Sequence, residues 1–144
     1  MPASNAQTFC YSDLTVGQTA EFAVSLTEKV ITQFAALSGD HSPLHMDEAY
    51  AETTPFKGRI AQGMLGASFF SRLVGMHLPG KYALYLSQQL MFKQPVRAGM
   101  NLTVRGEVVQ KTDAAQVVKI KTQIIDAASG SCLIDGEAMV KLLA

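Results

Sequence analysis

Tryptophan is absent from the 144-residue sequence, cysteine occurs only twice, and neither sign of charge is in excess. Cys10 and Cys132 lie far apart, which indicates neither a disulfide framework nor a metal site, so we expect reduced thiols and a cytoplasmic location. The formal net charge is zero, and the chain has neither a basic block nor an acidic tail. This charge pattern argues against nucleic acid as a partner.

Long uninterrupted hydrophobic runs are also lacking. The most apolar stretch, 60–78, contains Gln62, Arg72 and His77, so it is a poor membrane span. The N-terminal segment Met1–Gln7 is polar and has no apolar signal core. Hydrophobic residues nonetheless make up 48% of the chain, which is enough to form a core. We therefore expect one domain over the whole chain and no membrane partner.

The first part of the chain predicts a strand followed by a helix. Residues 19–26 alternate weakly between polar and apolar, as in a half-buried strand. Apolar side chains then recur at helical spacing, at Val30, Ile31, Phe34 and Leu37. Thr27 is a suitable N-cap for this helix, and Gly39 suits the position just after its end. Asp40 is thereby placed directly after a helix C-terminus.

Two further helices are expected in the middle of the chain. Asp47 can cap a short helix that runs through Glu52. A longer helix follows from Ile60 or Gly63 to Met76, and it is apolar around most of its circumference. Such a helix is normally buried, and its small residues allow close approach of a neighbouring backbone. We expect a sheet to wrap this helix.

The last part of the chain predicts strands separated by turns. The expected strands are Tyr82–Phe92, Asn101–Val109, Ala115–Ile125 and Ser131–Leu143. Turn signals lie between them at 97–99, 111–113 and 127–130. Because the connections are short, antiparallel pairing is favoured. The expected fold class is α+β, with one long helix packed against an antiparallel sheet.

Asp40 and His45 form the most informative polar pair in the sequence. Pro43 lies between them and disfavours the helical region for Ser42, so we expect both side chains on a kinked loop. Gly63, eighteen residues after His45, is the expected start of the long helix. The first N–H groups of a helix lack internal partners and carry the positive end of its dipole. A carboxylate, an imidazole and an open helix start can together hold a water molecule and polarise a carbonyl group.

Several runs of the sequence also match a known pattern. They are Phe34–His45, Gly58–Leu65, Leu78–Gly80, Phe92–Val96 and Gly136–Leu142. These runs resemble the MaoC-like family, and within it the (R)-specific enoyl-CoA hydratases that supply polyhydroxyalkanoate precursors in fatty acid metabolism. The resemblance spans nearly the whole chain. The Asp-x4-His element alone is a weak signal, but its spacing to the glycine-led helix makes the match fairly specific.

The resemblance implies a hot-dog fold, in which a long central helix is wrapped by an antiparallel sheet, and a homodimer. It implies hydration of trans-2-enoyl-CoA to (R)-3-hydroxyacyl-CoA by a lyase that uses neither metal nor redox cofactor. We expect short acyl chains, and coenzyme A is part of the substrate. Asp40 and His45 are then catalytic, and the Gly63 N–H faces the thioester carbonyl. Which of the two side chains takes the proton from water is left open by the residue types.

Four further residues are expected to bind substrate. Ser71 and Val74 match family positions that line the acyl pocket, whereas Ser42 and Gln62 flank the catalytic residues. Two of these depart from the family pattern. Many relatives have asparagine in place of Ser42 and histidine in place of Gln62. Since Gln62 does not titrate near neutral pH, we interpret it as supporting the site rather than transferring protons.

Three alternative functions fit parts of the same pattern. An acyl-thioester hydrolase would aim the water at the carbonyl carbon, but the Asp-x4-His signature resembles hydratases. A 3-hydroxyacyl-acyl-carrier-protein dehydratase would favour a basic rim for its carrier, for which the neutral charge gives no support. A non-catalytic acyl-CoA-binding module would not need Asp40 and His45, and their presence argues against it. The hydratase is therefore the leading prediction.

Overall fold

The computed structural model describes residues 4–144, so the start of the predicted polar segment Met1–Gln7 lies outside the described residues. Within residues 4–144, five strands form one sheet in the order β1-β3-β4-β5-β2, and all neighbours are antiparallel. The strands are β1 (Thr19–Ser25), β2 (Ala83–Phe92), β3 (Asn101–Thr112), β4 (Val117–Asp126) and β5 (Cys132–Leu142). The predicted antiparallel sheet is thus confirmed.

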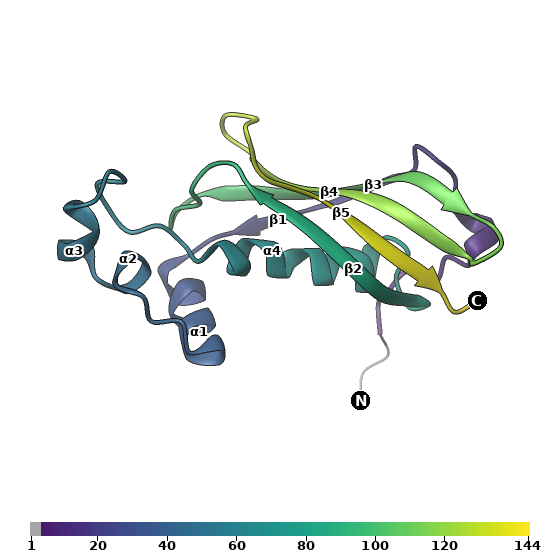
Figure 1. Ribbon diagram of the computed structural model, residues 1–144, viewed down its shortest axis with the longest axis horizontal. Coiled ribbons are helices and arrows are strands. Elements are labelled where there is room, and N and C mark those ends of the chain that lie inside the picture. Colours follow the sequence, from purple (N-terminus) through teal and green to yellow (C-terminus); the bar gives the residue numbers. More distant parts are fainter. Residues whose placement is uncertain (1–3) are drawn as a thin grey trace.

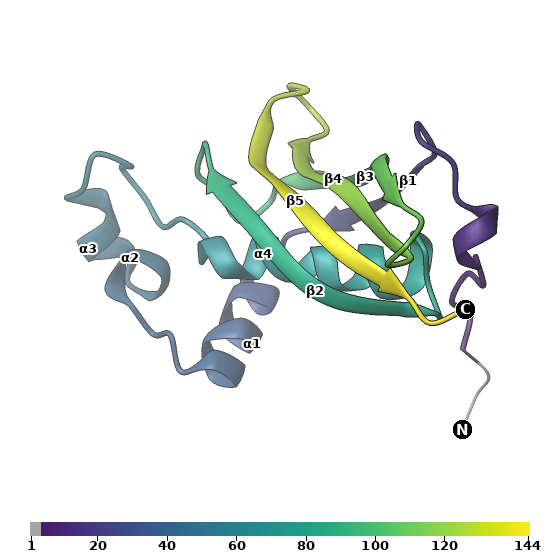
Figure 2. The ribbon, with the colours of Figure 1, turned by 45° about the vertical axis from the view of Figure 1, so that its right-hand side comes forward.

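Besides the short turn η1, the helices divide into a central helix, formed by α4 and η2, and a group of three at one end of the sheet. They are η1 (Tyr11–Asp13), α1 (Glu28–Ser38), α2 (Pro43–Met46), α3 (Glu48–Glu52), α4 (Gly63–Arg72) and η2 (Leu73–His77). Figure 1 shows α4 lying along one face of the sheet, with α1, α2 and α3 gathered beyond the sheet where α4 begins. In Figure 2 the strands curve around α4. No helix of the described residues is long and apolar enough to cross a membrane.

The core lies between the sheet and the central helix. Gly66 of α4 lies so close to β5 that an added Cβ would be 2.6 Å from Cδ1 of Ile134. Gly106 of β3 makes the reciprocal approach, since its Cβ would lie 2.9 Å from Leu73 Cδ2. The two large partners are fully buried, and each such side chain stabilises the fold by about 1.5–3 kcal/mol. Small residues therefore permit the close helix–sheet contact that the sequence predicts.

The central helix differs from the prediction in two respects. It ends at Arg72 and continues as the π-helical turn η2 up to His77, rather than as one α-helix to Met76. One of its faces is also open, because the sheet covers only one side. Met64 is 58% exposed, and Ser68 and Ser71 are exposed on the same face. The expectation of burial on nearly all sides is wrong for a single copy of the chain.

The end of η2 is closed by backbone hydrogen bonds. Leu78 N–H donates to the Leu73 carbonyl at 2.8 Å, and Gly80 N–H donates to the Val74 carbonyl at 2.9 Å. Gln7 N–H, from the N-terminal segment, donates to the Met76 carbonyl at 2.9 Å. The last carbonyl groups of a helix lack internal partners, so these bonds satisfy groups that would otherwise face water. The C-terminal end of the central helix is therefore sealed within the fold.

Candidate active site

Asp40 is positioned by the end of α1. Thr27 caps the start of this helix, where its Oγ1 accepts from Val30 N–H at 3.3 Å. Gly39 ends it with a φ of 80°, a left-handed conformation that glycine adopts without strain. The Asp40 N–H then donates to Ser38 Oγ at 3.1 Å. The predicted cap residues and the predicted place of Asp40 are confirmed.

His45 lies on the helical turn α2 rather than on the expected loop. Pro43 occupies the first position of this turn, where its fixed φ and missing N–H are favourable. Ser42, as its N-cap, has the extended backbone that a residue before proline prefers (φ −51°, ψ 133°). Its carbonyl accepts from His45 N–H at 2.9 Å. Pro43 therefore starts a short helix instead of merely bending a loop, which is a correction to the prediction.

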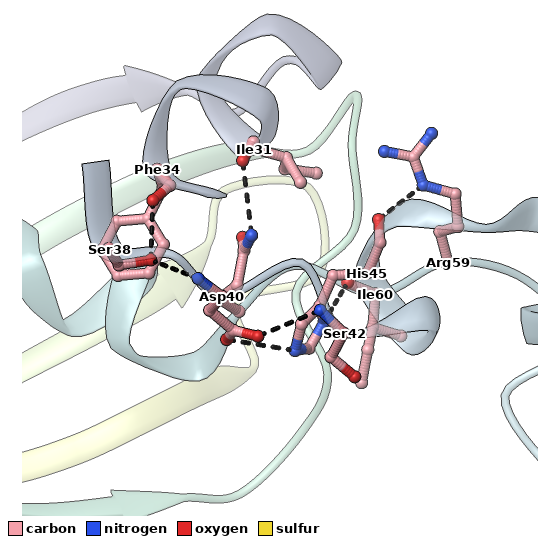
Figure 3. A network of polar contacts seen from close by, with 9 residues as sticks. Ile31, Phe34, Ser38, Asp40, Ser42, His45, Arg59 and Ile60 are labelled. Atoms are coloured by element: carbon pink, nitrogen blue, oxygen red, sulfur yellow. Dashed lines mark hydrogen bonds and ion pairs between the residues drawn. The ribbon is translucent and has the colours of Figure 1, made fainter. Parts of the chain in front are cut away.

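The two side chains face each other (Figure 3). Oδ2 of Asp40 lies 3.8 Å from Nε2 of His45. The other carboxylate oxygen, Oδ1, accepts from Ser42 N–H at 3.2 Å. The His45 side chain is 14% exposed and that of Asp40 is 44% exposed, so the pair lies at the protein surface with the imidazole largely enclosed. The predicted convergence of Asp40 and His45 is present.

The far side of the imidazole determines its tautomer. Nδ1 lies 2.8 Å from the carbonyl oxygen of Ile60, which can only accept a hydrogen bond. Nδ1 therefore carries a proton, and in the neutral ring Nε2 presents a lone pair toward Asp40. Two acceptors 3.8 Å apart cannot bond to each other, but one water molecule can donate a hydrogen to each of them. The geometry thus provides a place for a water molecule held by both groups.

Gly63 begins α4 beside this pair. Its N–H has no protein acceptor in the described part of the chain, and no side chain caps the helix start. His45 and Gly63 both line a pocket of about 290 Å³. Its apolar wall includes Phe56, Phe92 and Ile134. An N–H at the positive end of a helix, facing a pocket, is suited to polarise a carbonyl oxygen.

Two residues that the sequence analysis missed hold His45 in place. Besides the Ile60 carbonyl, Nε of Arg59 donates to the carbonyl oxygen of His45 at 2.6 Å (Figure 3). Ile60 N–H also donates to the Leu44 carbonyl at 3.3 Å. Neither residue belongs to a periodic pattern, and a backbone carbonyl leaves no mark in the sequence. Only their position in the sequence, just before Gly63, indicated that they could lie near the site.

Of the four residues predicted to bind substrate, not all lie close to Asp40 and His45. Ser42 is adjacent, but its backbone N–H rather than its hydroxyl contacts Asp40. Gln62 is 1% exposed, and its Nε2 donates to the Ile31 carbonyl at 3.3 Å, which ties the start of α4 to α1. Ser71 is exposed and Val74 is buried in the core, and neither lines the pocket beside His45. Substrate binding by these four residues stays a prediction.

No metal-binding cluster is present in residues 4–144, because no three carboxylate, imidazole or thiol groups come together. The groups that come together are an acid–base pair, a hydrogen-bond donor and an apolar pocket. Such a set can add water to, or remove water from, a compound that carries a carbonyl group.

Comparison with known proteins places the chain in a family. The MaoC-like domain model matches residues 12–128. The (R)-specific enoyl-CoA hydratase of Rhodospirillum rubrum is 42% identical over 130 residues, which cover 90% of this chain and 89% of the relative. The enzyme of the same name from Aeromonas caviae is 43% identical over 129 residues, which cover 90% of this chain and 96% of the relative.

A solved structure extends the likeness to the fold. The R-hydratase PhaJ1 from Pseudomonas aeruginosa, in its unliganded form, superposes with a TM-score of 0.88 at 42% identity, covering 95% of this chain and 87% of that one. The sheet wrapped around α4 is the hot-dog fold, as predicted. The chain belongs to the MaoC-like domain family.

Proposed function

We propose that this protein is an enoyl-CoA hydratase that converts trans-2-enoyl-CoA to (R)-3-hydroxyacyl-CoA. The observation that carries the proposal is the Asp40–His45 pair, 3.8 Å apart, whose His45 lines one pocket together with Gly63 at the start of α4. The relatives named as (R)-specific enoyl-CoA hydratases, at 42% and 43% identity, support the substrate and the R configuration. The proposed reaction uses neither metal nor redox cofactor, because adding water involves no net oxidation or reduction and the pair itself activates the water; coenzyme A is part of the substrate.

The reaction is an addition of water across a conjugated double bond. The water held between Asp40 and His45 attacks C3 of the enoyl group, and one of its protons passes to the pair. Electron density moves onto the thioester oxygen, where the Gly63 N–H stabilises it. The same pair then delivers a proton to C2, so that the hydroxyl group and the hydrogen add to one face of the substrate. Both protons of the water are accounted for, and the pair returns to its starting state.

Short acyl chains fit the pocket. Its volume of about 290 Å³ lies just below the range of roughly 300–1,000 Å³ that is typical of ligand pockets. One methylene group in an apolar pocket changes discrimination by only about 1–3 kcal/mol, so the preference for short chains is graded rather than absolute. A polyhydroxyalkanoate precursor with a short side chain is a suitable product.

The active form is a homodimer. The exposed face of α4 carries Met64 beside small residues, which is the kind of surface that another subunit can approach closely. The edge strand β2 also exposes apolar side chains, among them Leu86 at 52% and Met91. A long unpaired edge with apolar side chains is a surface that proteins normally cover. Pairing of two copies along β2 would cover both surfaces in a cytoplasmic protein. Sedimentation equilibrium at twice the chain mass supports this arrangement, whereas a monomer at assay concentration contradicts it.

Crotonyl-CoA tests the function directly. Hydration removes the absorbance of the conjugated thioester, and chiral analysis of the product should give the R alcohol. His41→Gln, which changes an exposed histidine of the same segment, serves as a matched control for His45→Gln and should retain activity. Release of free thiol without hydration would favour an acyl-thioester hydrolase. Turnover of crotonyl-acyl-carrier protein in preference to crotonyl-CoA would favour the acyl-carrier-protein dehydratase.

A further inference from the structure

Arg59 contacts His45 on the side away from Asp40 (Figure 3). Its Nε donates to the His45 carbonyl oxygen at 2.6 Å in a partly buried setting. A hydrogen bond from a charged donor is shorter and roughly twice as strong as one between neutral groups. This contact is therefore a strong restraint on the backbone that carries the imidazole.

The neighbouring residue, Ile60, restrains His45 at two further points. Its carbonyl accepts from Nδ1 of the ring at 2.8 Å, and its N–H donates to the Leu44 carbonyl at 3.3 Å. The consecutive residues Arg59 and Ile60 thus hold the backbone of α2 and the imidazole together. If the Arg59 bond is lost, the backbone of α2 can shift relative to the Ile60 carbonyl, and the ring then loses its fixed orientation.

The helical turn α2 depends on such outside support. It has four residues, and a helix of this length is unstable by itself. The carbonyl of His45 is near its end, where carbonyl groups lack internal partners. Arg59 supplies the partner for this carbonyl. The orientation of His45 is therefore set by residues outside α2.

We propose that Arg59 is a positioning residue, which acts through His45 and does not touch the reacting atoms. The kinetic part of this inference rests on the proposed hydratase function. Arg59 keeps Nε2 of His45 directed at Oδ2 of Asp40, so that the pair can hold the water. The site therefore includes Arg59, which contacts the backbone of His45 and not the substrate.

Arg59→Met removes the donor and keeps the side chain as far as the position of Nε. A displacement of about 1 Å in a catalytic group can reduce the rate by about 10²-fold, so we expect kcat for crotonyl-CoA to fall by about 10- to 100-fold. KM should change by less than about threefold, because no substrate contact is lost. Arg59→Gln, whose amide can donate to the same carbonyl, should recover a large part of kcat although it carries no charge.

Lys111→Met is the matched control. Lys111 Nζ donates to the Leu14 carbonyl at 2.6 Å, the distance of the Arg59 bond, and also to the Tyr11 carbonyl at 3.0 Å. This contact lies near η1, at the opposite end of the molecule from α2 (Figure 1). The control should lose stability like Arg59→Met and keep the wild-type kcat. A matching loss of kcat in Lys111→Met would assign the effect to stability and overturn the inference.

The histidine tautomer gives a readout that does not depend on activity. The sequence has three histidines, so the signals of the ring nitrogens can be assigned by comparison with His45→Gln. In the wild-type protein His45 should carry its proton on Nδ1, and in Arg59→Met it should show both tautomers. If Arg59→Met does not fold, Arg59→Lys, which has a carbon in place of the donor nitrogen Nε, carries the same two measurements, and Arg59→Gln remains the rescue variant.

Two results would overturn the inference. One is a wild-type kcat and a single Nδ1–H tautomer in Arg59→Met. The other is a rise in KM alone that disappears with crotonyl-pantetheine, because Arg59 would then bind the phosphates of coenzyme A. Absence of hydratase activity in the wild-type protein would instead remove the proposed function, and the tautomer measurement would still decide whether Arg59 positions His45.

Discussion

The two ends of the central helix are built in opposite ways. At its start, the Gly63 N–H has no protein acceptor in residues 4–144, and Gly63 lines a pocket together with His45. At its far end, the carbonyl groups of Leu73, Val74 and Met76 each accept a backbone hydrogen bond. The side chains also differ, since the start has Asp40 and His45 nearby, whereas the far end is packed into the core. One end is open for a ligand and the other is closed for stability.

This difference separates function from stability within one element. Substitutions at the open end should alter catalysis more than the free energy of unfolding, and substitutions at the closed end should do the reverse. A backbone group left without a partner costs free energy unless water or a ligand satisfies it. The open start of α4 is therefore the expected place for the polar atom of a substrate.

The largest effect is expected from the acid–base pair. Asp40→Asn and His45→Gln should each lower kcat by about 10²–10⁴-fold, because each removes one of the two groups that hold and deprotonate the water. The double variant should be little worse than the worse single variant, because the two act as a unit. Steady-state kinetics with crotonyl-CoA measure kcat, and circular dichroism of each variant checks that the fold is intact. Full activity in either single variant would refute the assignment.

A smaller loss of kcat is expected when the start of α4 is blocked. In Gly63→Val the added Cβ would lie 2.9 Å from Cε1 of Phe92 and would also narrow access to the N–H. Loss of one oxyanion donor lowers kcat by about 10²–10³-fold, and we expect a fall near the lower limit. Combining it with Phe92→Ala makes room for the side chain without restoring access to the amide. If the double variant regains wild-type kcat, the effect is a packing effect and the amide is not the donor.

At the closed end the expected effect is on stability. Gly80 has a φ of 96°, and an added Cβ would lie 2.1 Å from the carbonyl oxygen of Gln7. Gly80→Ala should therefore lower the free energy of unfolding by about 1–3 kcal/mol. The kcat of the folded fraction should stay at the wild-type value. Urea unfolding measures the free energy of unfolding, and crotonyl-CoA kinetics on the same sample measure kcat. An unchanged unfolding curve would contradict the close contact between Gly80 and the Gln7 carbonyl.

The smallest effect concerns His77, also at the closed end. Burial, with a contribution from the Arg72 cation, lowers the pKa of His77 below its ordinary value of 6.5. The unfolded chain then binds the proton more readily than the folded chain does. Stability should fall as the pH drops below the unfolded pKa, and the loss ends below the folded pKa. His77→Gln should make unfolding less dependent on pH as the pH falls below 6.5, as measured by urea titration. An unchanged dependence would exclude this contribution.

Much of the fold, and the place of Asp40 in the candidate site, could be predicted from the sequence. Cap residues such as Thr27 and Gly39 act locally, so the ends of α1 and the place of Asp40 follow from them. The strands follow from period-two patterns and turns, although β3 runs on to Thr112 through a predicted turn. Pro43 between Asp40 and His45 indicated that the two side chains converge, and the resemblance to the MaoC-like family implied the hot-dog fold.

Other features could not be predicted because they depend on backbone atoms and tertiary contacts. The bonds of Arg59 and Ile60 to His45 join segments fourteen and fifteen residues apart, and one partner in each is a carbonyl oxygen. The exposure of Met64 depends on how far the sheet reaches around α4. The π-helical turn η2 arises where Leu73 and Val74 are held in the core, which no periodic pattern reveals.

The claim that the open start of α4 polarises the substrate can be measured on a bound, non-reactive thioester. Butyryl-CoA labelled with ¹³C at the carbonyl carbon has a stretching frequency that falls when its oxygen accepts a strong hydrogen bond. Infrared difference spectra of the complex should show this fall with the wild-type protein and with Asp40→Asn, and should show less of it with Gly63→Val. A bound thioester whose carbonyl frequency equals that in water, or a fall of equal size in Gly63→Val, would contradict the account.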